Sequence, residues 1–282
     1  MKIAISTEST VDLTKELIRE NDVKIVPFTV LLGNQTGLDG EITGRDIIEF
    51  VNKNKILPKT SAVNRIQYEE HFGALLKEYD AIVHISLSSK LSSAYENAMA
   101  VSKELKNVYV IDSQSLSTGI ALLVLYAKEL IDKGLNPEQI VEKVESRKSF
   151  VQASFELKRV DYLYKGGRCS VLSFLGANLL KIRPQILLKE GKMIAGKKYR
   201  GNFKRVVENY VLDVLEEYSN PDLSRVFLTY TTAEPEIIDY VKEVLIGRGF
   251  KEVLVTVAGA TITSHCGEDC LGILYINDGE QN

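Results

Sequence analysis

Hydroxyl side chains are concentrated in four short stretches of this 282-residue chain, at residues 6–10, 60–61, 86–93 and 113–117. Ser and Thr at such positions can cap the free amides at the start of a helix. Several helix N-termini and hydroxyl donors together can also bind a carboxylate or a phosphate without a full positive charge. The residue types allow both roles, and of two neighbouring residues one can cap a helix while the other binds an anion.

A second candidate is the turn formed by Gly166, Gly167 and Arg168. Glycines at such a position commonly end a helix, although they can also wrap a phosphate. The Arg168 guanidinium is well matched to two oxygens of one anion. The sequence contains neither Gly-x-x-x-x-Gly-Lys-Ser/Thr nor a Gly-x-Gly-x-x-Gly after a strand. A self-contained NTPase or dinucleotide enzyme therefore has little support.

His265 lies in a Gly- and hydroxyl-flanked stretch that we expect to be a loop between two strands, and it can donate or accept a proton at neutral pH. Cys266 and Cys270 beside it suggest zinc, but adjacent ligands are geometrically awkward and no fourth ligand is near, so we expect no metal. Ser92, His265 and Asp112 could also compose a hydrolase triad. No Gly-x-Ser-x-Gly turn supports that alternative.

Apolar runs alternate with helical patterns in the first half of the chain. The expected strands lie at 2–6, 23–32, 81–87 and 108–112, and the expected helices at 13–20, 46–52, 64–79 and 92–105. Asn64 and Gln67 have the spacing of a capping box. This alternation predicts a mostly parallel sheet. Ligands bind beyond the carboxyl ends of such strands, so the loops after Ser6, Leu87 and Asp112 are the places to search.

The pattern changes after residue 149, following helices expected at 117–133 and 137–147. Later elements are expected as strands at 150–155, 225–230, 253–257 and 271–276, a hairpin at 186–195, and helices at 170–180, 203–218 and 235–248. We therefore expect two α/β domains. The N-terminal domain, 1–150, has a mostly parallel sheet, and the C-terminal domain, 151–282, has a mixed sheet. The boundary is approximate, and segments can exchange between the domains.

Composition and charge exclude several classes of protein. The chain is 45% hydrophobic and has 35 basic and 38 acidic residues, which excludes disorder and gives no uniform field for nucleic acid. Nine Lys and Arg residues against one Glu make residues 181–207 strongly basic. That segment is either a solvated surface or a dock for an acidic partner, a phosphate or a membrane. A nucleic-acid-binding regulator ranks last among the alternatives, so we expect no nucleic acid as partner.

Three cysteines, Cys169, Cys266 and Cys270, cannot build a disulfide framework. The N-terminus opens directly on a strand-like segment without a basic and apolar leader. The richest apolar stretch, residues 119–126, is short enough to be a buried helix segment. We therefore expect a cytoplasmic protein.

Six motifs occur in one order along nearly the whole chain. They are Glu8-Ser9-Thr10-x-Asp12-Leu13, Thr60-Ser61, Ser88-Ser89-Lys90-Leu91-Ser92-Ser93-Ala94-Tyr95, Ile111-Asp112-Ser113, Tyr162-Leu163-x-Lys165-Gly166-Gly167-Arg168 and His265-x-Gly267. Each motif alone is weak, but six in register are specific. The chain resembles the DegV family, the fatty-acid-binding proteins that serve as the B subunit of bacterial fatty acid kinase.

The resemblance implies a two-domain DegV-like α/β fold with a long acyl chain in an internal pocket. It implies that Thr60 and Ser92 hydrogen-bond the carboxylate of the fatty acid, together with their neighbours Ser61 and Ser93. Arg168 and His265 are implied beside the same head group. Arg168 is then the candidate for stabilising a phosphate, and no other residue is implied as catalytic.

The implied function is to bind a long-chain fatty acid, such as palmitate, and to present its carboxylate to a separate ATP-binding kinase subunit. The resulting acyl phosphate feeds phospholipid synthesis, and transient membrane contact is expected during lipid transport. The chain is then no enzyme alone and needs no cofactor besides an acid of roughly C14 to C18. Burying about 14 methylenes at roughly 0.8 kcal/mol each gives on the order of 11 kcal/mol before association costs. The alternative is a stand-alone acyl hydrolase or phosphotransferase.

Several positions depart from the family pattern. Glu8 replaces an Asp, Ala62 and Val63 follow the Thr-Ser pair, and Ser93-Ala94 replaces Gly-Thr. The stretch Cys266 to Cys270 replaces Gly-Pro-Gly, and its Glu268 and Asp269 would repel an acyl phosphate unless they point away.

Overall fold

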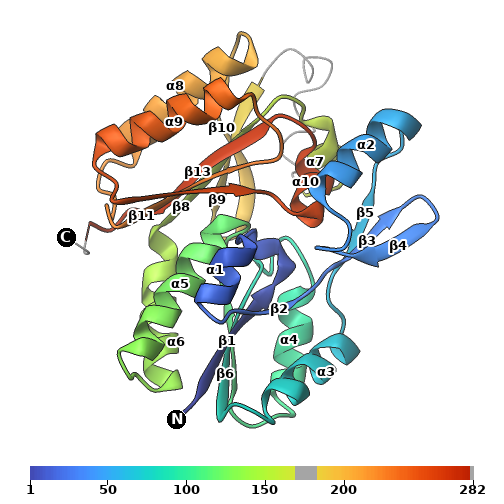
Figure 1. The fold of residues 1–282 in the computed structure, drawn as a ribbon, viewed down its shortest axis with the longest axis vertical. Helices are drawn as coiled ribbons and strands as arrows, with labels where there is room; N and C mark the ends of the chain where they lie inside the picture. The colour runs from blue at the N-terminus through green and yellow to red at the C-terminus, as the bar shows by residue number, and fades with distance from the viewer. Residues whose placement is uncertain (169–182, 280–282) are drawn as a thin grey trace.

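The structure, a computed structural model, describes residues 1–168 and 183–279. The helix expected at 170–180, together with Cys169 and Lys181, lies outside the described residues. Two larger sheets lie one above the other, and helix α5 runs between them (Figure 1). This arrangement confirms the α/β fold class.

The first sheet is parallel, in the strand order β2-β1-β6-β7. Its strands are β1 (Ile3–Glu8), β2 (Lys24–Val26), β6 (Ala81–Ser86) and β7 (Val108–Asp112). The helices of this region are α1 (Lys15–Glu20), α3 (Arg65–Leu75), α4 (Ala94–Ser102) and α6 (Pro137–Arg147). Every residue of β6 is buried, as a parallel strand covered on both faces requires. Asn64 and Asn136 begin α3 and α6 through capping boxes, which confirms the predicted helix starts.

The second sheet is mixed, in the order β10-β9-β8-β13-β11-β12. Its strands are β8 (Val151–Leu157), β9 (Arg183–Lys189), β10 (Lys192–Tyr199), β11 (Arg225–Tyr230), β12 (Glu252–Val257) and β13 (Cys270–Ile276). Only β11 and β12 pair in parallel within it. Helices α8 (Phe203–Glu217) and α9 (Pro235–Arg248) cover one face (Figure 1). Glu190 and Gly191 turn β9 into β10 with positive φ angles, as a tight hairpin demands.

Helix α5 (Thr118–Asp132) packs against strands of both sheets, and most of its residues are buried. The apolar stretch at 119–126 is therefore a buried helix segment, as predicted. None of the described helices combines the length and the apolar character needed to cross a membrane. Ile120 and Phe155, from either side of residue 150, belong to one core cluster, and the domain division near residue 150 stays a prediction.

The single strand predicted at 23–32 is wrong, because the chain leaves the first sheet after Val26. Pro27, which has no N–H to donate to a ladder, separates β2 from β3. A small antiparallel sheet follows, in the order β4-β3-β5, made of β3 (Thr29–Leu32), β4 (Gln35–Leu38) and β5 (Lys59–Ser61). Helix α2 (Gly44–Asn54) packs against α10 (Ala260–Cys266), and α10 also contacts α7 (Asp161–Lys165). Short 3-10 turns occupy η1 (Ser9–Val11) and η2 (Lys148–Phe150).

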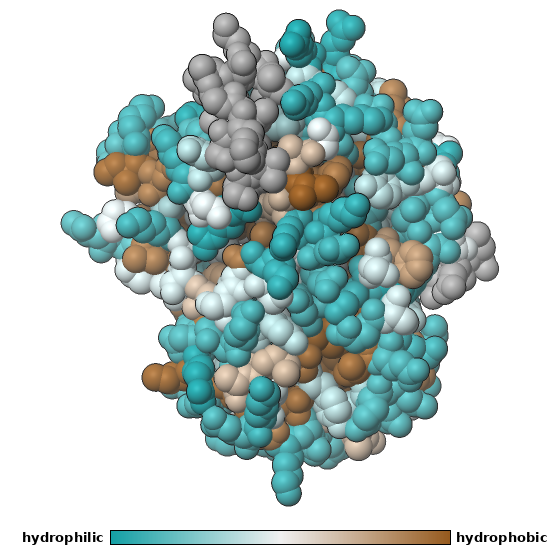
Figure 2. Space-filling view, turned by 180° about the vertical axis from the view of Figure 1, so that it is seen from behind, coloured by the Kyte–Doolittle hydropathy of each residue, from teal (hydrophilic) through white to brown (hydrophobic). Residues whose placement is uncertain are grey.

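The surface seen from behind is predominantly hydrophilic, and its apolar residues form separate patches (Figure 2). Large apolar side chains are buried in the core clusters instead. This face offers no broad apolar platform.

Candidate functional site

A cavity opens at the carboxyl ends of the parallel strands, with an empty volume of about 520 Å³ including its mouth. Each of three strands supplies a lining residue from the loop that follows it. Thr10 comes after β1, Ser92 after β6 and Leu116 after β7. The loops after these strands, which the sequence marks as the places to search, all reach this one cavity, and their role in binding stays a prediction.

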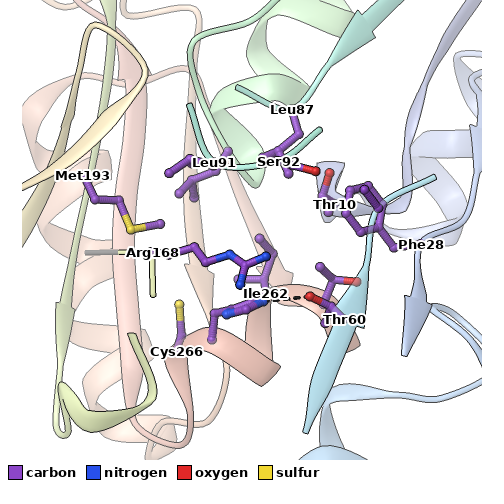
Figure 3. A pocket seen from close by; sticks show the side chains of 14 residues that line it. Thr10, Phe28, Thr60, Leu87, Leu91, Ser92, Arg168, Met193, Ile262 and Cys266 are labelled. Carbon is purple, nitrogen blue, oxygen red and sulfur yellow. Dashed lines mark hydrogen bonds between the residues drawn. The ribbon is translucent and has the colours of Figure 1, made fainter. Parts of the chain in front are cut away.

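The opposite wall comes from segments far away in the sequence (Figure 3). Strand β5 supplies Thr60, helix α10 supplies Thr261 and His265, and Arg168 reaches in from the turn after α7. Four of the residues predicted from sequence, Thr60, Ser92, Arg168 and His265, therefore meet around one space. Arg168 is the only fully charged side chain among the described lining residues.

Thr60 and His265 are in direct contact, with Thr60 Oγ1 2.8 Å from His265 Nε2. The other imidazole nitrogen, Nδ1, is buried and has no hydrogen-bond partner within the described residues. It faces Gly166, where an added Cβ would lie only 2.8 Å away. Gly166 is thus required by close approach to the imidazole, and Arg168 Nη1 donates to the Gly166 carbonyl at 2.6 Å.

Burial lowers the pKa of His265 to about 4, and the positive charge of Arg168 adds to that effect. The imidazole is therefore neutral at physiological pH. The neutral imidazole adds no charge, so the Arg168 guanidinium gives this end of the cavity a single positive charge. Such an end attracts one anionic group and offers it uncharged hydrogen bonds.

Two further hydroxyls are also suited to binding an anionic group. Thr10 Oγ1 and Thr261 Oγ1 are buried, line the cavity, and have no hydrogen-bond partner among residues 1–168 and 183–279. In Figure 3 the side chains of Thr10 and Ser92 point toward one another. Sequence reasoning assigned neither Thr10 nor Thr261 to the site. Thr10 lies inside the hydroxyl-rich stretch 6–10 and could have been found from it, whereas nothing in the sequence singled out Thr261.

Helix α10, which carries His265, corrects the expected loop at this position. Two carboxylates hold its start: Asp12 accepts from the Gly259 N–H at 2.7 Å, and Asp39 accepts from the N–H groups of Ala260 and Thr261. The helix begins because distant acidic side chains satisfy its first amides. The sequence carries no local capping signal at this point, so the prediction of a loop at 261–267 is wrong. Burial raises the pKa of Asp12 to about 8, although the hydrogen bonds that Asp12 accepts from Ser117 and Gly259 act to lower it.

A buried network supports the loop that carries Ser92. One Glu8 oxygen accepts from Tyr68 Oη at 2.6 Å and Ser86 Oγ at 2.6 Å and lies 3.0 Å from His84 Nε2. Its other oxygen accepts from the Leu87 N–H at 2.9 Å. Burial acts to raise the pKa of Glu8, but His84 and these hydrogen bonds outweigh it, so the pKa is lowered. Glu8 therefore ties β1 to the first residue of the loop that lines the cavity.

Two other predicted residues lie apart. Ser61 and Ser93 are exposed and are not among the residues that line the cavity. Asp269, which we expected to repel an acyl phosphate unless it points away, is held outside the cavity lining. Its oxygens accept from Lys158 Nζ at 2.5 Å and from Thr232 Oγ1 at 3.1 Å. Glu268 is not a lining residue either.

The alternative hydrolase triad is not assembled. Asp112 accepts hydrogen bonds from Ser89 and from the Gln114 N–H, while His265 contacts Thr60. A Ser-His-Asp enzyme needs the carboxylate on the imidazole to fix its tautomer. Within the described part of the chain, no three His, Cys, Asp or Glu side chains gather as metal ligands.

The rest of the cavity is apolar, with Phe28, Leu87, Leu91, Met193 and Ile262 in its walls. A second, mostly apolar cavity adjoins it. The residues shared by both walls are Leu116, Ile262 and Cys266. The described site therefore combines a polar end with an apolar interior that continues past these three side chains.

Comparisons with known proteins identify the family of the chain. The family model described as "Uncharacterised protein, DegV family" matches residues 2–278. A relative from Thermotoga maritima named "Fatty acid-binding protein" is 28% identical over 280 residues, covering 96% of each chain.

Two solved structures share the fold. "Fatty Acid Binding of a DegV family Protein from Thermus thermophilus" superposes with a TM-score of 0.90 at 27% identity, covering 98% of this chain and 100% of that one. DegV from Bacillus subtilis, titled a fatty acid binding protein, gives 0.86 at 28% identity, with coverages of 99% and 100%. The family match spans almost the whole sequence and confirms the resemblance inferred from the six motifs. The chain belongs to the DegV family.

Proposed function

We propose that this protein binds one long-chain fatty acid, with its carboxylate at Thr60, Ser92 and His265 and its acyl chain in the apolar cavities. The observation that carries the proposal is the set of unpartnered polar atoms at one end of an apolar space: Thr10 Oγ1, Thr261 Oγ1 and His265 Nδ1. Buried polar atoms without partners are costly, and a carboxylate head group offers acceptors to the two hydroxyls.

The division of charge favours an acid over a neutral lipid. Arg168 supplies one positive charge at the polar end, and the remaining donors there are neutral. A carboxylate buried without hydrogen bonds would cost several kcal/mol, so several donors from different loops are the arrangement that an acyl anion needs. Titles of DegV structures from Thermus thermophilus and Bacillus subtilis, which name fatty acid binding, support the same ligand class.

The finer part of the proposal is that a separate ATP-binding kinase subunit phosphorylates the presented carboxylate. Arg168, which is exposed at the cavity mouth, then neutralises charge as the acyl phosphate forms. The chain itself carries no phosphate-loop motif, so the ATP chemistry belongs to the partner. The basic residues of β9 and β10, the hairpin that supplies Met193 to the cavity wall, offer a surface to an acidic partner or a membrane.

The binding step is tested by native mass spectrometry of the wild type and a Thr60→Ala/Ser92→Ala double variant after incubation with palmitate. The wild type should retain the acid, and the double variant should retain much less. Equal occupancy would show that the head-group assignment is wrong. For the kinase step, Arg168→Ala should keep the acid but lose phosphorylation by the ATP-binding subunit, and unchanged phosphorylation would contradict the role of Arg168.

A further inference from the structure

Asp39 joins the small sheet to helix α10. It directly follows β4, and its backbone N–H donates to the Phe28 carbonyl at 2.9 Å, which fixes its place beside the small sheet. Its side chain is only 7% exposed and reaches the start of α10. There Oδ1 accepts from the Ala260 N–H at 2.8 Å, and Oδ2 accepts from the Thr261 N–H at 3.2 Å. The backbone of one residue is thus anchored beside the sheet, while its carboxylate holds the helix.

The same carboxylate also holds the loop after β1. Ser9 Oγ donates to Asp39 Oδ2 at 3.0 Å and accepts from the Phe28 N–H at 3.1 Å. Thr10, which follows Ser9 in the chain, lines the cavity together with Phe28 and Thr261. Three segments of the cavity wall therefore meet at one side chain, and the hydrogen bonds of Asp39 set the spacing between them.

Both partners of the contact between Thr60 and His265 depend on this link. Thr60 lies on β5, which pairs with β3 of the small sheet. His265 lies one helical turn after Thr261, and both residues line the cavity. Helix α10 has only seven residues, so a displacement of its first turn also moves its last turn, which holds the imidazole.

Asp12, the other carboxylate at the start of α10, cannot take over this role. It accepts from the Gly259 N–H at 2.7 Å, one residue before the helix begins. Asp12 belongs to the loop after β1, so its hydrogen bond does not fix the helix against the small sheet. The first N–H groups of a helix have no partner within the helix, and Asp39 is the acceptor for those of Ala260 and Thr261.

We propose that Asp39 is a positioning residue of the carboxylate site, which holds α10 against the small sheet so that His265 and Thr60 meet in the geometry that binds the head group. This role rests on the proposed function. Asp39 is not among the described residues that line the cavity, so it acts through the residues that it holds. Loss of its carboxylate should therefore weaken recognition of the head group more than retention of the acyl chain.

Two substitutions of Asp39 and one control separate this role from a general effect on folding. Asp39→Ala removes all three side-chain hydrogen bonds, whereas Asp39→Asn keeps the shape of the side chain but cannot serve all three donors, because its NH₂ group accepts none. Asp222→Ala is the matched control. Asp222 is 5% exposed and accepts from the Ser224 N–H at 2.8 Å and from Arg147 Nη2 at 2.7 Å. None of these three residues lines the cavity.

Competition between palmitate and its uncharged methyl ester, read by native mass spectrometry, measures recognition of the head group. The wild type should prefer the acid. The preference should fall about tenfold in Asp39→Ala, as for the loss of one hydrogen bond to a charged group, and by less in Asp39→Asn. Asp222→Ala should keep the wild-type preference even where both ligands bind less tightly. An unchanged preference in Asp39→Ala, or an equal fall in Asp222→Ala, would overturn the proposal.

The imidazole of His265 is observed separately, in the proteins without ligand. The NMR signals of its ring nitrogens should shift in Asp39→Ala, because Nε2 loses its contact with Thr60, and should stay in place in Asp222→Ala. Wild-type signals in Asp39→Ala would overturn the proposal. If Asp39→Ala does not fold, the smaller change expected in Asp39→Asn decides both readouts. Wild-type protein that binds neither palmitate nor the ester would contradict the proposed function instead, and the ring signals would still decide whether Asp39 positions the imidazole.

Discussion

Thr60 and His265 stand 205 positions apart in the chain, and Thr60 Oγ1 lies 2.8 Å from His265 Nε2. The contact joins β5 of the small sheet to α10, which lies between strands β12 and β13 of the large one. It places a hydroxyl and a neutral imidazole at the polar end of an apolar cavity, next to Arg168. The proposed carboxylate site depends on this contact.

Thr60→Val should weaken fatty acid binding by about 10- to 100-fold, because it removes one hydrogen bond to a charged group at nearly constant volume. Titration calorimetry with palmitate measures the change. Ser61→Ala is the matched control, since Ser61 is exposed and does not line the cavity. An equal effect of both substitutions would show that Thr60 has no specific role.

Gly166→Ala should also weaken binding, although glycine itself touches no ligand. Its new methyl group would lie 2.8 Å from His265 Nδ1, so the imidazole must shift away from Gly166, which disturbs the contact of its Nε2 with Thr60. Gly73→Ala in α3 is the control, because no atom lies within 4 Å of its added Cβ. Palmitate affinity should fall in the first variant and stay constant in the second. Wild-type affinity of Gly166→Ala would mean that the imidazole position is unimportant.

The pKa of His265 should rise when the acid binds. In the empty cavity burial and Arg168 lower that pKa to about 4, and a carboxylate beside the ring favours its charged form. Binding then takes up a proton, so affinity should increase as the pH falls through the pKa of the complex. NMR titration of the imidazole, empty and loaded, measures both values. His71, whose pKa burial and His84 lower to about 4 and which does not line the cavity, should not respond.

An unchanged pKa of His265 on loading would contradict its place at the carboxylate. A response of His71 equal to that of His265 would instead indicate a general change of the fold. Either result is read from the same spectra.

Glu156→Gln should stabilise the protein increasingly as pH rises. Burial raises the pKa of Glu156 to about 8, although Arg183 lowers it, whereas the unfolded value is near 4.5. The folded state therefore binds the proton more tightly, and this contribution to stability is lost as pH rises toward 8, by up to about 1.4 kcal/mol per pH unit. Urea unfolding of both proteins at about pH 6 and pH 8 should show the difference growing. A difference that is independent of pH would contradict a protonated Glu156.

Elements that begin or end at signals from neighbouring residues are predicted well from the sequence. The capping boxes at Asn64 and Asn136 and the Glu190-Gly191 turn rest on neighbouring residues, and the structure has them as expected. Helix α10 is not predictable from local patterns, because its first N–H groups donate hydrogen bonds to Asp12 and Asp39, which come from other parts of the chain. Tertiary contacts, which a local pattern does not contain, decide such elements.

The same distinction applies to the site. Thr60, Ser92, Arg168 and His265 were found because their motifs resemble a family, and the structure brings them to one cavity. Thr261 was missed because a Thr in a short helix carries no signal until its hydroxyl is seen unpartnered in that cavity.

Organic extraction of the purified full-length protein, followed by lipid mass spectrometry, tests the central claim most directly. On the proposed function, a C16 acid would bury on the order of 14 methylenes and stay bound through purification. We expect about one fatty acid per chain, of roughly C14 to C18, and a much lower yield from the Thr60→Val/Ser92→Ala variant. Wild-type protein that yields no fatty acid, even after incubation with palmitate and oleate, would contradict it.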